Sequence, residues 1–186
     1  MSHEELADVL AKVLKKRGAV LRGDFVLSSG RRSSVYIDMR RLLGDESSYT
    51  VALDLLLEAG AQELARSSAV IGVATGGLPW AAMLALRLSK PLGYVRPERK
   101  GHGTGSQVEG EPPRGRVVVV DDVATTGSSI ASSVEVLRNS GYTVTTALVL
   151  VDRGEGAREL LASMGVRLVS VATLESILKA LDRNPA

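Results

Sequence analysis

The sequence predicts an α/β protein with a central, mostly parallel sheet flanked by helices. Short runs of β-branched and other apolar residues alternate with helix-length segments from about residue 46 onward, and this alternation is typical of parallel sheets covered on both faces. The chain has 186 residues, of which 45% are hydrophobic, and this is enough for one domain with its own core. We therefore expect a single domain over residues 1–186, made of an N-terminal segment over 1–44 and a core over 45–186.

The N-terminal segment is expected to begin with a helix and to continue with short strands. Ser2 and Glu5 form a capping-box pattern, and apolar residues then recur at helical spacing until Gly18, which ends the helix. Three apolar runs follow and are separated by segments that contain glycine or serine. These runs lie at 19–21, 25–27 and 35–37, and each is typical of a short strand.

The core is expected to start with a helix from about Glu46 to Arg66, in which Gly60 is a weak point. The strands predicted after it lie at 70–73, 92–95, 117–120, 143–151 and 166–171. The helices predicted among and after these strands lie at 78–88, 130–137, 155–164 and 174–181. We expect no regular structure over 97–115, because this stretch is rich in glycine and almost free of apolar side chains.

Composition excludes several classes of protein. The 23 basic and 21 acidic residues nearly cancel to a net charge of +2, which argues against a general nucleic-acid coat protein. The absence of cysteine removes disulfides, thiolate nucleophiles and zinc–thiolate sites. No apolar run approaches the ~20 residues of a membrane span, and the acidic N-terminus does not resemble a signal peptide. We expect a cytoplasmic protein with neither a nucleic-acid nor a membrane partner.

The most informative loop follows the strand predicted at 117–120, since ligands of such sheets bind beyond the carboxyl ends of the strands. Four valines run into Asp121 and Asp122, which precede a turn rich in hydroxyl groups and then a helix. Backbone N–H groups at a helix N-terminus, with hydroxyls beside them, form an anion site suited to phosphate. The two carboxylates would repel phosphate unless they face sugar hydroxyls or Mg²⁺. The string therefore suits a ligand with a phosphate, a diol and a metal.

A second loop joins the strand predicted at 70–73 to the next helix. Thr75, Gly76 and Gly77 lie in it, and Pro79 stands early in the helix. Paired glycines in such a place leave bare backbone amides that can point at an anion. This pattern favours a second phosphate-type site, although a tight strand-to-helix turn would need the same residues.

A third loop combines cations with glycines. Arg96, Arg99, Lys100 and His102 lie within seven residues, and Gly101, Gly103 and Gly105 are interspersed at its end. Such a segment suits a lid that closes over a polyanion and stabilises negative charge on a departing group. His102 could add a proton.

The string from Val117 to Ser129 closely resembles the signature with which the type I phosphoribosyltransferases bind 5-phosphoribosyl 1-diphosphate (PRPP), and the loop over 74–79 matches their pyrophosphate loop. Three further segments resemble the orotate phosphoribosyltransferases within that family. They are the motif from Phe25 to Arg40, which resembles the orotate-side hood, the lid motif from Tyr94 to Gly103, and Asp152-Arg153. The resemblance spans nearly the whole chain.

The resemblance implies a type I phosphoribosyltransferase fold with a small N-terminal hood. It implies transfer of the 5-phosphoribosyl group of PRPP to orotate, which gives orotidine 5′-monophosphate and pyrophosphate in de novo pyrimidine synthesis. It also implies Mg²⁺ as cofactor, and a homodimer in which the lid of one subunit reaches the site of its neighbour.

The resemblance also implies roles for individual residues. The implied catalytic residues are Lys100, His102, Arg96 and Asp122. The implied PRPP ligands are Arg96, Lys100, His102, Thr75, Gly76, Asp121, Asp122, Val123, Ala124, Thr125, Thr126, Gly127, Ser128 and Ser129. The implied orotate contacts are Thr125, Arg153, Tyr36 and Ile37. Asp121 and Asp122 are the implied Mg²⁺ ligands, partly through PRPP or water.

The sequence departs from the family at a few positions. Pro97 stands where relatives often have lysine, as do Ser28 and Thr75, so the site is expected to hold fewer cations. Two alternatives stay open. The first, a phosphoribosyltransferase for another base, is disfavoured by Arg153, because an uncharged base needs no carboxylate partner. The second, a PRPP-sensing regulator that binds RNA or DNA without catalysis, is disfavoured by the intact lid motif.

Overall fold

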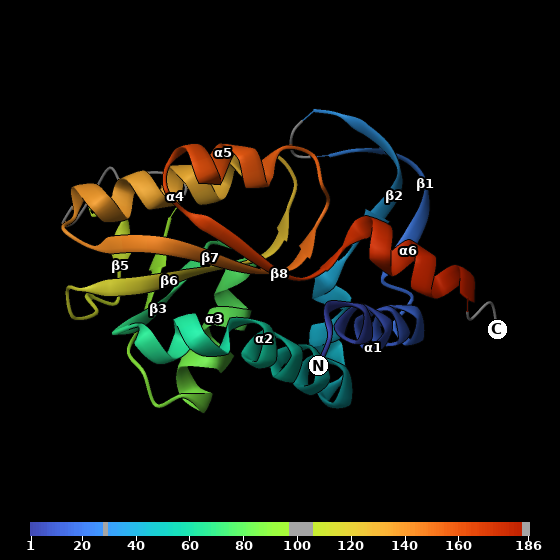
Figure 1. The fold of residues 1–186 in the computed structure, drawn as a ribbon, viewed down its shortest axis with the longest axis horizontal. Coiled ribbons are helices and arrows are strands. Elements are labelled where there is room, and N and C mark those ends of the chain that lie inside the picture. The colour runs from blue at the N-terminus through green and yellow to red at the C-terminus, as the bar shows by residue number, and fades with distance from the viewer. Residues whose placement is uncertain (28–29, 97–105, 184–186) are drawn as a thin grey trace.

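The structure is a computed structural model that describes residues 1–27, 30–96 and 106–183. A mostly parallel sheet lies between two layers of helices, and a two-stranded antiparallel ribbon stands beside it (Figure 1). The strands are β1 (Val20–Val26), β2 (Arg32–Ile37), β3 (Ala69–Val73), β4 (Leu92–Val95), β5 (Val108–Glu109), β6 (Arg116–Ala124), β7 (Thr143–Asp152) and β8 (Arg167–Thr173). The helices are α1 (His3–Lys16), the 3₁₀ helix η1 (Met39–Gly44), α2 (Glu46–Arg66), α3 (Gly77–Arg87), α4 (Ser128–Asn139), α5 (Ala157–Ser163) and α6 (Leu174–Arg183).

The order of strands in the large sheet brings together the three loops that follow β3, β6 and β7. The order is β5-β4-β3-β6-β7-β8, and all neighbouring pairs except β4 and β5 are parallel. Gly72 at the end of β3 pairs with Val120, and Ala124 at the end of β6 pairs with Asp152. The segments that follow β3, β6 and β7 therefore leave the sheet side by side at one edge, the one formed by the carboxyl ends of these strands. The predicted α/β class and parallel sheet are confirmed.

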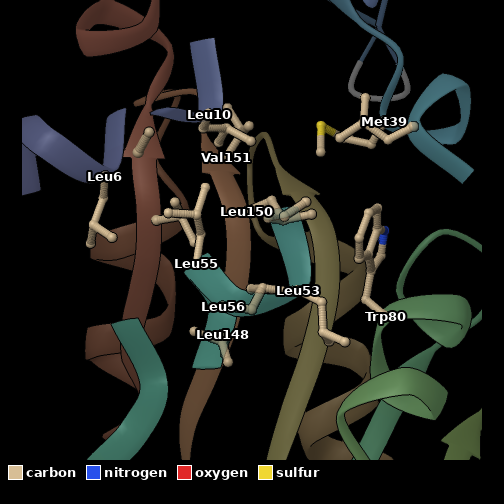
Figure 2. Packing of buried hydrophobic residues seen from close by; sticks show 14 of the residues in the cluster. Leu6, Leu10, Met39, Leu53, Leu55, Leu56, Trp80, Leu148, Leu150 and Val151 are labelled. Carbon is tan, nitrogen blue, oxygen red and sulfur yellow. The ribbon is translucent and has the colours of Figure 1, made fainter. Parts of the chain in front are cut away.

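The sheet is buried on both faces because its central strands carry apolar residues that face both ways, as in β3 and in residues 117–120 of β6. Val118 and Val120 of β6 belong to the hydrophobic cluster that also contains residues of α1, α2, α3 and α6. Val117 and Val119 face the opposite way, toward α4 and α5. Figure 2 shows part of the first cluster, in which Trp80 of α3 is 1% exposed. This double layer fixes the edge of the sheet from which the three loops emerge.

The glycine in the middle of α2 has a packing reason. A Cβ atom at Gly60 would lie 2.7 Å from Cδ2 of Leu148 in β7. The absence of a side chain at Gly60 thus lets α2 approach the sheet closely, and the cost in helix propensity is offset by this contact.

The N-terminal segment differs from prediction in its strands. The apolar runs at 19–21 and 25–27 do not form two strands but one, β1, which pairs antiparallel with β2. The register shifts between Arg22 and Phe25, where β1 accommodates one more residue than β2. A β-bulge of this kind lets a strand continue through a glycine. The ribbon and η1 make up the hood. The sequence pattern did not predict η1.

The stretch over 97–115 also contains structure that was not predicted. Val108 and Glu109 form β5, which pairs antiparallel with β4 at the edge of the sheet. Val108 is 7% exposed and lies opposite Val95. A single buried valine in a glycine-rich stretch gave too weak a pattern to predict a strand. Among the described residues, no helix is long and apolar enough to span a membrane.

Candidate active site

Two adjacent carboxylates stand at the end of β6. Their side chains are held by backbone amides of the same strand: the N–H of Asp122 donates to Asp121 Oδ1 at 2.9 Å, and the N–H of Val123 donates to Asp122 Oδ1 at 2.7 Å. Asp121 is 8% exposed. These bonds fix both carboxyl groups at the edge where the three loops meet.

The acidic pair is electrostatically strained by its burial. Burial raises the pKa of Asp121 well above its ordinary value, and the neighbouring charge of Asp122 adds to this shift. Burial also raises the pKa of Asp122, while the hydrogen bond from Val123 N–H and the positive charge of Arg40 in the hood act in the opposite direction. A bound cation or hydroxyl donors would relieve this strain, because both stabilise the ionised carboxylate.

The loop after β3 lies directly against this pair. A Cβ atom at Gly76 would lie 2.6 Å from Oδ1 and 2.7 Å from Oδ2 of Asp122, and one at Gly77 would lie 2.7 Å from the Cα of Asp121. Only glycines permit this approach. Thr75 is exposed in the same loop, and the Ala74–Thr75 peptide is cis. The loop and the carboxylates therefore form one surface.

The third component is the turn between β6 and α4. Gly127 caps α4 with φ of 82°, and a Cβ there would lie 3.0 Å from the Cα of Ala157. The hydroxyl groups of Thr126 and Ser128 are 2.7 Å apart. A small cavity of about 40 Å³ is lined by Asp121, Val123, Ala124, Thr125, Thr126, Gly127, Ser128, Ser129 and Ile130. Amides at a helix N-terminus beside hydroxyl groups suit an anion such as phosphate.

Arg153 connects the end of β7 to the hood. Its Nη1 and Nη2 each donate to the carbonyl oxygen of Val35 at 3.3 Å, and Nη2 also donates to Ser33 Oγ at 3.0 Å. Its Nε donates to Glu155 Oε1 at 2.7 Å. This places a buried cation beside β2, the strand that also carries Tyr36, whose ring centroid lies 5.6 Å from that of Phe25.

The structure places the loops after β3, β6 and β7, with their predicted site residues, at the carboxyl ends of adjacent strands. Two other predicted residues, Ile37 and Arg96, have side chains that contact the protein itself. Ile37 is 5% exposed and its side chain packs in the hydrophobic core, so only its backbone can face a ligand. Arg96 follows β4, and its Nη1 lies 3.3 Å from Oε1 of Glu109 in β5. Lys100 and His102 lie outside the described residues, as do Pro97 and Ser28.

Sequence reasoning did not single out two acidic partners of the site's arginines. Glu109 pairs with Arg96 and Glu155 pairs with Arg153. Glu109 lies in a strand that the pattern did not predict, whereas Glu155 stands two residues from Arg153. Its proximity in sequence was therefore a usable signal for an ion pair.

The glycine loop, the two carboxylates and the start of α4 all lie within the segment that defines the class of this protein, the phosphoribosyltransferases. Residues 50–172 match the family model described as the phosphoribosyl transferase domain.

Comparison with full-length relatives defines the branch of this family. The chain is 89% identical to the orotate phosphoribosyltransferase of Aeropyrum pernix over 97% of both chains, and 44% identical to that of Sulfolobus acidocaldarius over 93% of this chain and 87% of the relative. The crystal structure of orotate phosphoribosyltransferase from Aeropyrum pernix has a TM-score of 0.87 at 84% identity, over 93% of this chain and 99% of that one. The chain belongs to the orotate phosphoribosyltransferases, as the resemblance predicted.

The acidic pair makes a testable prediction about pH and stability. Because the pKa of Asp121 is raised in the folded state, stability falls as pH rises from the ordinary aspartate value of about 4 toward the folded pKa. Asp121→Asn retains an acceptor for the Asp122 N–H and removes the buried charge. In denaturant unfolding without ligand or metal, this variant should be more stable than the wild type at pH 7, and the difference should shrink as the pH approaches 4.

Asp45 supplies a control of opposite sign. Hydrogen bonds from Ser48, Ser47 and Lys16 lower the pKa of Asp45 at the start of α2, so Asp45→Asn should lower stability at pH 7 and matter less below pH about 4. An Asp121→Asn variant that is less stable than the wild type at pH 7 would contradict the assignment of a buried, strained carboxylate.

Proposed function

We propose that the edge where β3, β6 and β7 end is the active site for orotate phosphoribosyl transfer, the activity of this family. The enzyme transfers the 5-phosphoribosyl group of PRPP to orotate and releases pyrophosphate and orotidine 5′-monophosphate, a step of pyrimidine synthesis. The observation that carries the proposal is the contact of the Gly76 loop with the Asp122 carboxylate, beside the anion site at the start of α4.

In this reaction, displacement at the anomeric carbon builds positive charge on the ribose while negative charge grows on the departing pyrophosphate. The protein must hold the ribose rigidly and neutralise the leaving group. We assign the ribose hydroxyls to Asp121 and Asp122. Their carboxyl groups are already fixed by backbone amides, so little reorganisation accompanies binding.

The two ends of PRPP carry phosphates, and two loops suit them. Backbone amides and hydroxyls from Thr125 to Ser129 are assigned to the 5′-phosphate, because this segment lines the cavity at the start of α4. The loop with Thr75 and Gly76 is assigned to the pyrophosphate. The loop's position against Asp122 sets the separation between the two phosphate sites.

The lid is assigned to the leaving group. Arg96, Lys100 and His102 would neutralise the pyrophosphate as it departs, with Lys100 as the principal cation and His102 as a proton donor. Support for this assignment comes from the residue types and their spacing. Arg96 is half-buried beside Glu109, which holds the side chain at the base of the lid.

Orotate is assigned to the space between Arg153 and the hood. The guanidinium of Arg153 would meet the orotate carboxylate, as bidentate pairs of this kind are both strong and directional. Tyr36, the Ile37 backbone and Thr125 would bound the pyrimidine ring. The hydrogen bonds between Arg153 and β2 support this grouping, and the positive charge of Arg153 favours a base that carries a carboxylate.

The donor set of the site fits Mg²⁺. Asp121 and Asp122 supply carboxylate oxygens, and Mg²⁺ is commonly held by one or two carboxylates together with substrate phosphates. In the described ranges, no group of three or more acidic or histidine side chains is placed to hold a metal. Bound there, Mg²⁺ would neutralise phosphate charge.

We further propose that the enzyme works in the cytoplasm as a homodimer of a single domain over residues 1–186, with the lid of each subunit serving the site of its partner. The support is the family resemblance of the lid motif from Tyr94 to Gly103.

Activity is tested most simply by the loss of the ultraviolet absorbance of orotate. Absorbance should fall when PRPP and Mg²⁺ are added, and uracil, adenine and hypoxanthine should not be consumed. Chelation of Mg²⁺ with excess EDTA should stop the reaction and added Mg²⁺ should restore it, because the acidic pair and the phosphates repel each other without a cation. Equal consumption of a purine base, or full activity in EDTA, would refute the respective assignment.

The shared lid is tested by complementation between two variants. Lys100→Ala and Asp122→Asn should each lower kcat by on the order of a hundredfold or more, because each removes a group that acts on the transition state. A purified heterodimer of the two should regain about half of the wild-type activity per dimer, because one of its two sites is then intact. A heterodimer as inactive as either parent would show that each lid serves its own subunit.

A further inference from the structure

The guanidinium of Arg153 is held from two sides. Its side chain is 3% exposed, and its Nε donates to Glu155 Oε1 at 2.7 Å. The opposite edge of the group, formed by Nη1 and Nη2, faces β2, where both nitrogens contact the Val35 carbonyl oxygen at 3.3 Å. The shortest bond, at 2.7 Å, therefore lies on the Glu155 side, whereas the bonds on the hood side are 3.0 Å to Ser33 Oγ and 3.3 Å to the Val35 carbonyl oxygen.

From this arrangement we propose that Glu155 is a positioning residue for orotate. By binding Nε, its carboxylate fixes the plane of the Arg153 guanidinium so that the Nη1–Nη2 edge points at the orotate carboxylate. This inference rests on the proposed role of Arg153 in binding orotate. The guanidinium is planar and its donors form a rigid fork, so holding one edge orients the other.

Glu155 and orotate do not compete for the same donors. Glu155 takes the Nε edge. On the other edge, the bonds to Val35, at 3.3 Å, are at the weak end of the hydrogen-bond range, and the 3.0 Å bond to Ser33 Oγ is to a neutral hydroxyl. A carboxylate accepts stronger hydrogen bonds from a guanidinium than these neutral groups do. An orotate carboxylate can therefore accept from Nη1 and Nη2 while the ion pair stays intact. The charge of Glu155 also compensates a buried cation that would otherwise be costly in the absence of substrate.

The loop that carries Glu155 is itself anchored. Asp152 Oδ1 accepts from the Gly154 N–H at 2.9 Å, and its Oδ2 lies 2.7 Å from Nε of Arg158. Arg158 also donates to the Leu168 carbonyl oxygen in β8 at 3.1 Å. The backbone N–H of Arg153 donates to the Ala124 carbonyl oxygen at 2.9 Å. The Glu155 carboxylate is thus presented from a loop tied to both neighbouring strands.

The test compares Glu155→Ala and Glu155→Gln in steady-state kinetics. Glu155→Ala should raise the KM for orotate by on the order of tenfold or more, with the KM for PRPP within about twofold of the wild type. Glu155→Gln keeps an oxygen that accepts from Nε, so its KM for orotate should stay within about threefold of the wild type. A residue that only stabilised the fold would not separate the two KM values.

Glu63→Ala is the matched control. The Glu63 side chain is 15% exposed, against 19% for that of Glu155. Glu63 pairs with Arg167, the first residue of β8, and so lies at the amino end of that strand, away from the carboxyl ends where the site is proposed. Removing it should leave both KM values unchanged. Thermal unfolding of all variants identifies any loss of folded protein, and kinetic constants are then referred to the folded fraction.

Arg153→Ala separates failure of this inference from failure of the proposed function. If Arg153→Ala raises the KM for orotate and Glu155→Ala does not, positioning by Glu155 is overturned while the orotate site stands. If Arg153→Ala leaves the KM for orotate unchanged, the orotate assignment fails and the inference fails with it. The inference about Glu155 would also be overturned if Glu155→Ala and Glu63→Ala both raised the KM for orotate and the KM for PRPP to a similar extent. Such a result would show that loss of either ion pair perturbs the protein as a whole.

Discussion

The site depends on one close approach, in which the loop after β3 rests on the carboxylates at the end of β6. Side chains at positions 76 and 77 would collide with Asp122 and with the backbone of Asp121, so two glycines set the distance between the loops. The parallel pairing of β3 with β6 brings the loops to the same edge, and the double hydrophobic layer keeps that edge fixed. The proposed pyrophosphate loop and the proposed ribose-binding acidic pair can then share one ligand.

The distribution of charge follows from the same arrangement. Although the net charge is only +2, the site contains an acidic pair whose pKa values are raised by burial and on which Arg40 of the hood acts electrostatically. It also contains arginines that are paired with acids, at the end of β7 and at the base of the lid. Glu155 accompanies one of these, Arg153. Opposite charges are thus separated along one edge of the sheet, which suits a substrate that is anionic at its ends and hydroxylated between them.

Much of the fold and site could be predicted because the responsible patterns are local. Strand-like runs, helix caps and the string from Val117 to Ser129 all carry their information within short segments, thirteen residues in the longest case. What could not be predicted depends on pairing across the chain: β5 exists because Val108 packs opposite Val95, and β1 continues through Gly23 because β2 runs beside it. The burial of Ile37 in the core, which leaves only its backbone for orotate, likewise required the packed structure.

The central claim, that Gly76 and Asp122 form one PRPP site, is tested most directly by calorimetric titration of Gly76→Ala with PRPP and Mg²⁺. Gly76 has φ of −61° and ψ of −41°, so alanine adds no backbone strain and acts only by displacing the carboxylate. Affinity for PRPP should fall on the order of tenfold or more, whereas Gly44→Ala, whose Cβ would meet only the Arg17 side chain at 3.3 Å, should bind like the wild type. Wild-type affinity in a folded Gly76→Ala protein would contradict the account.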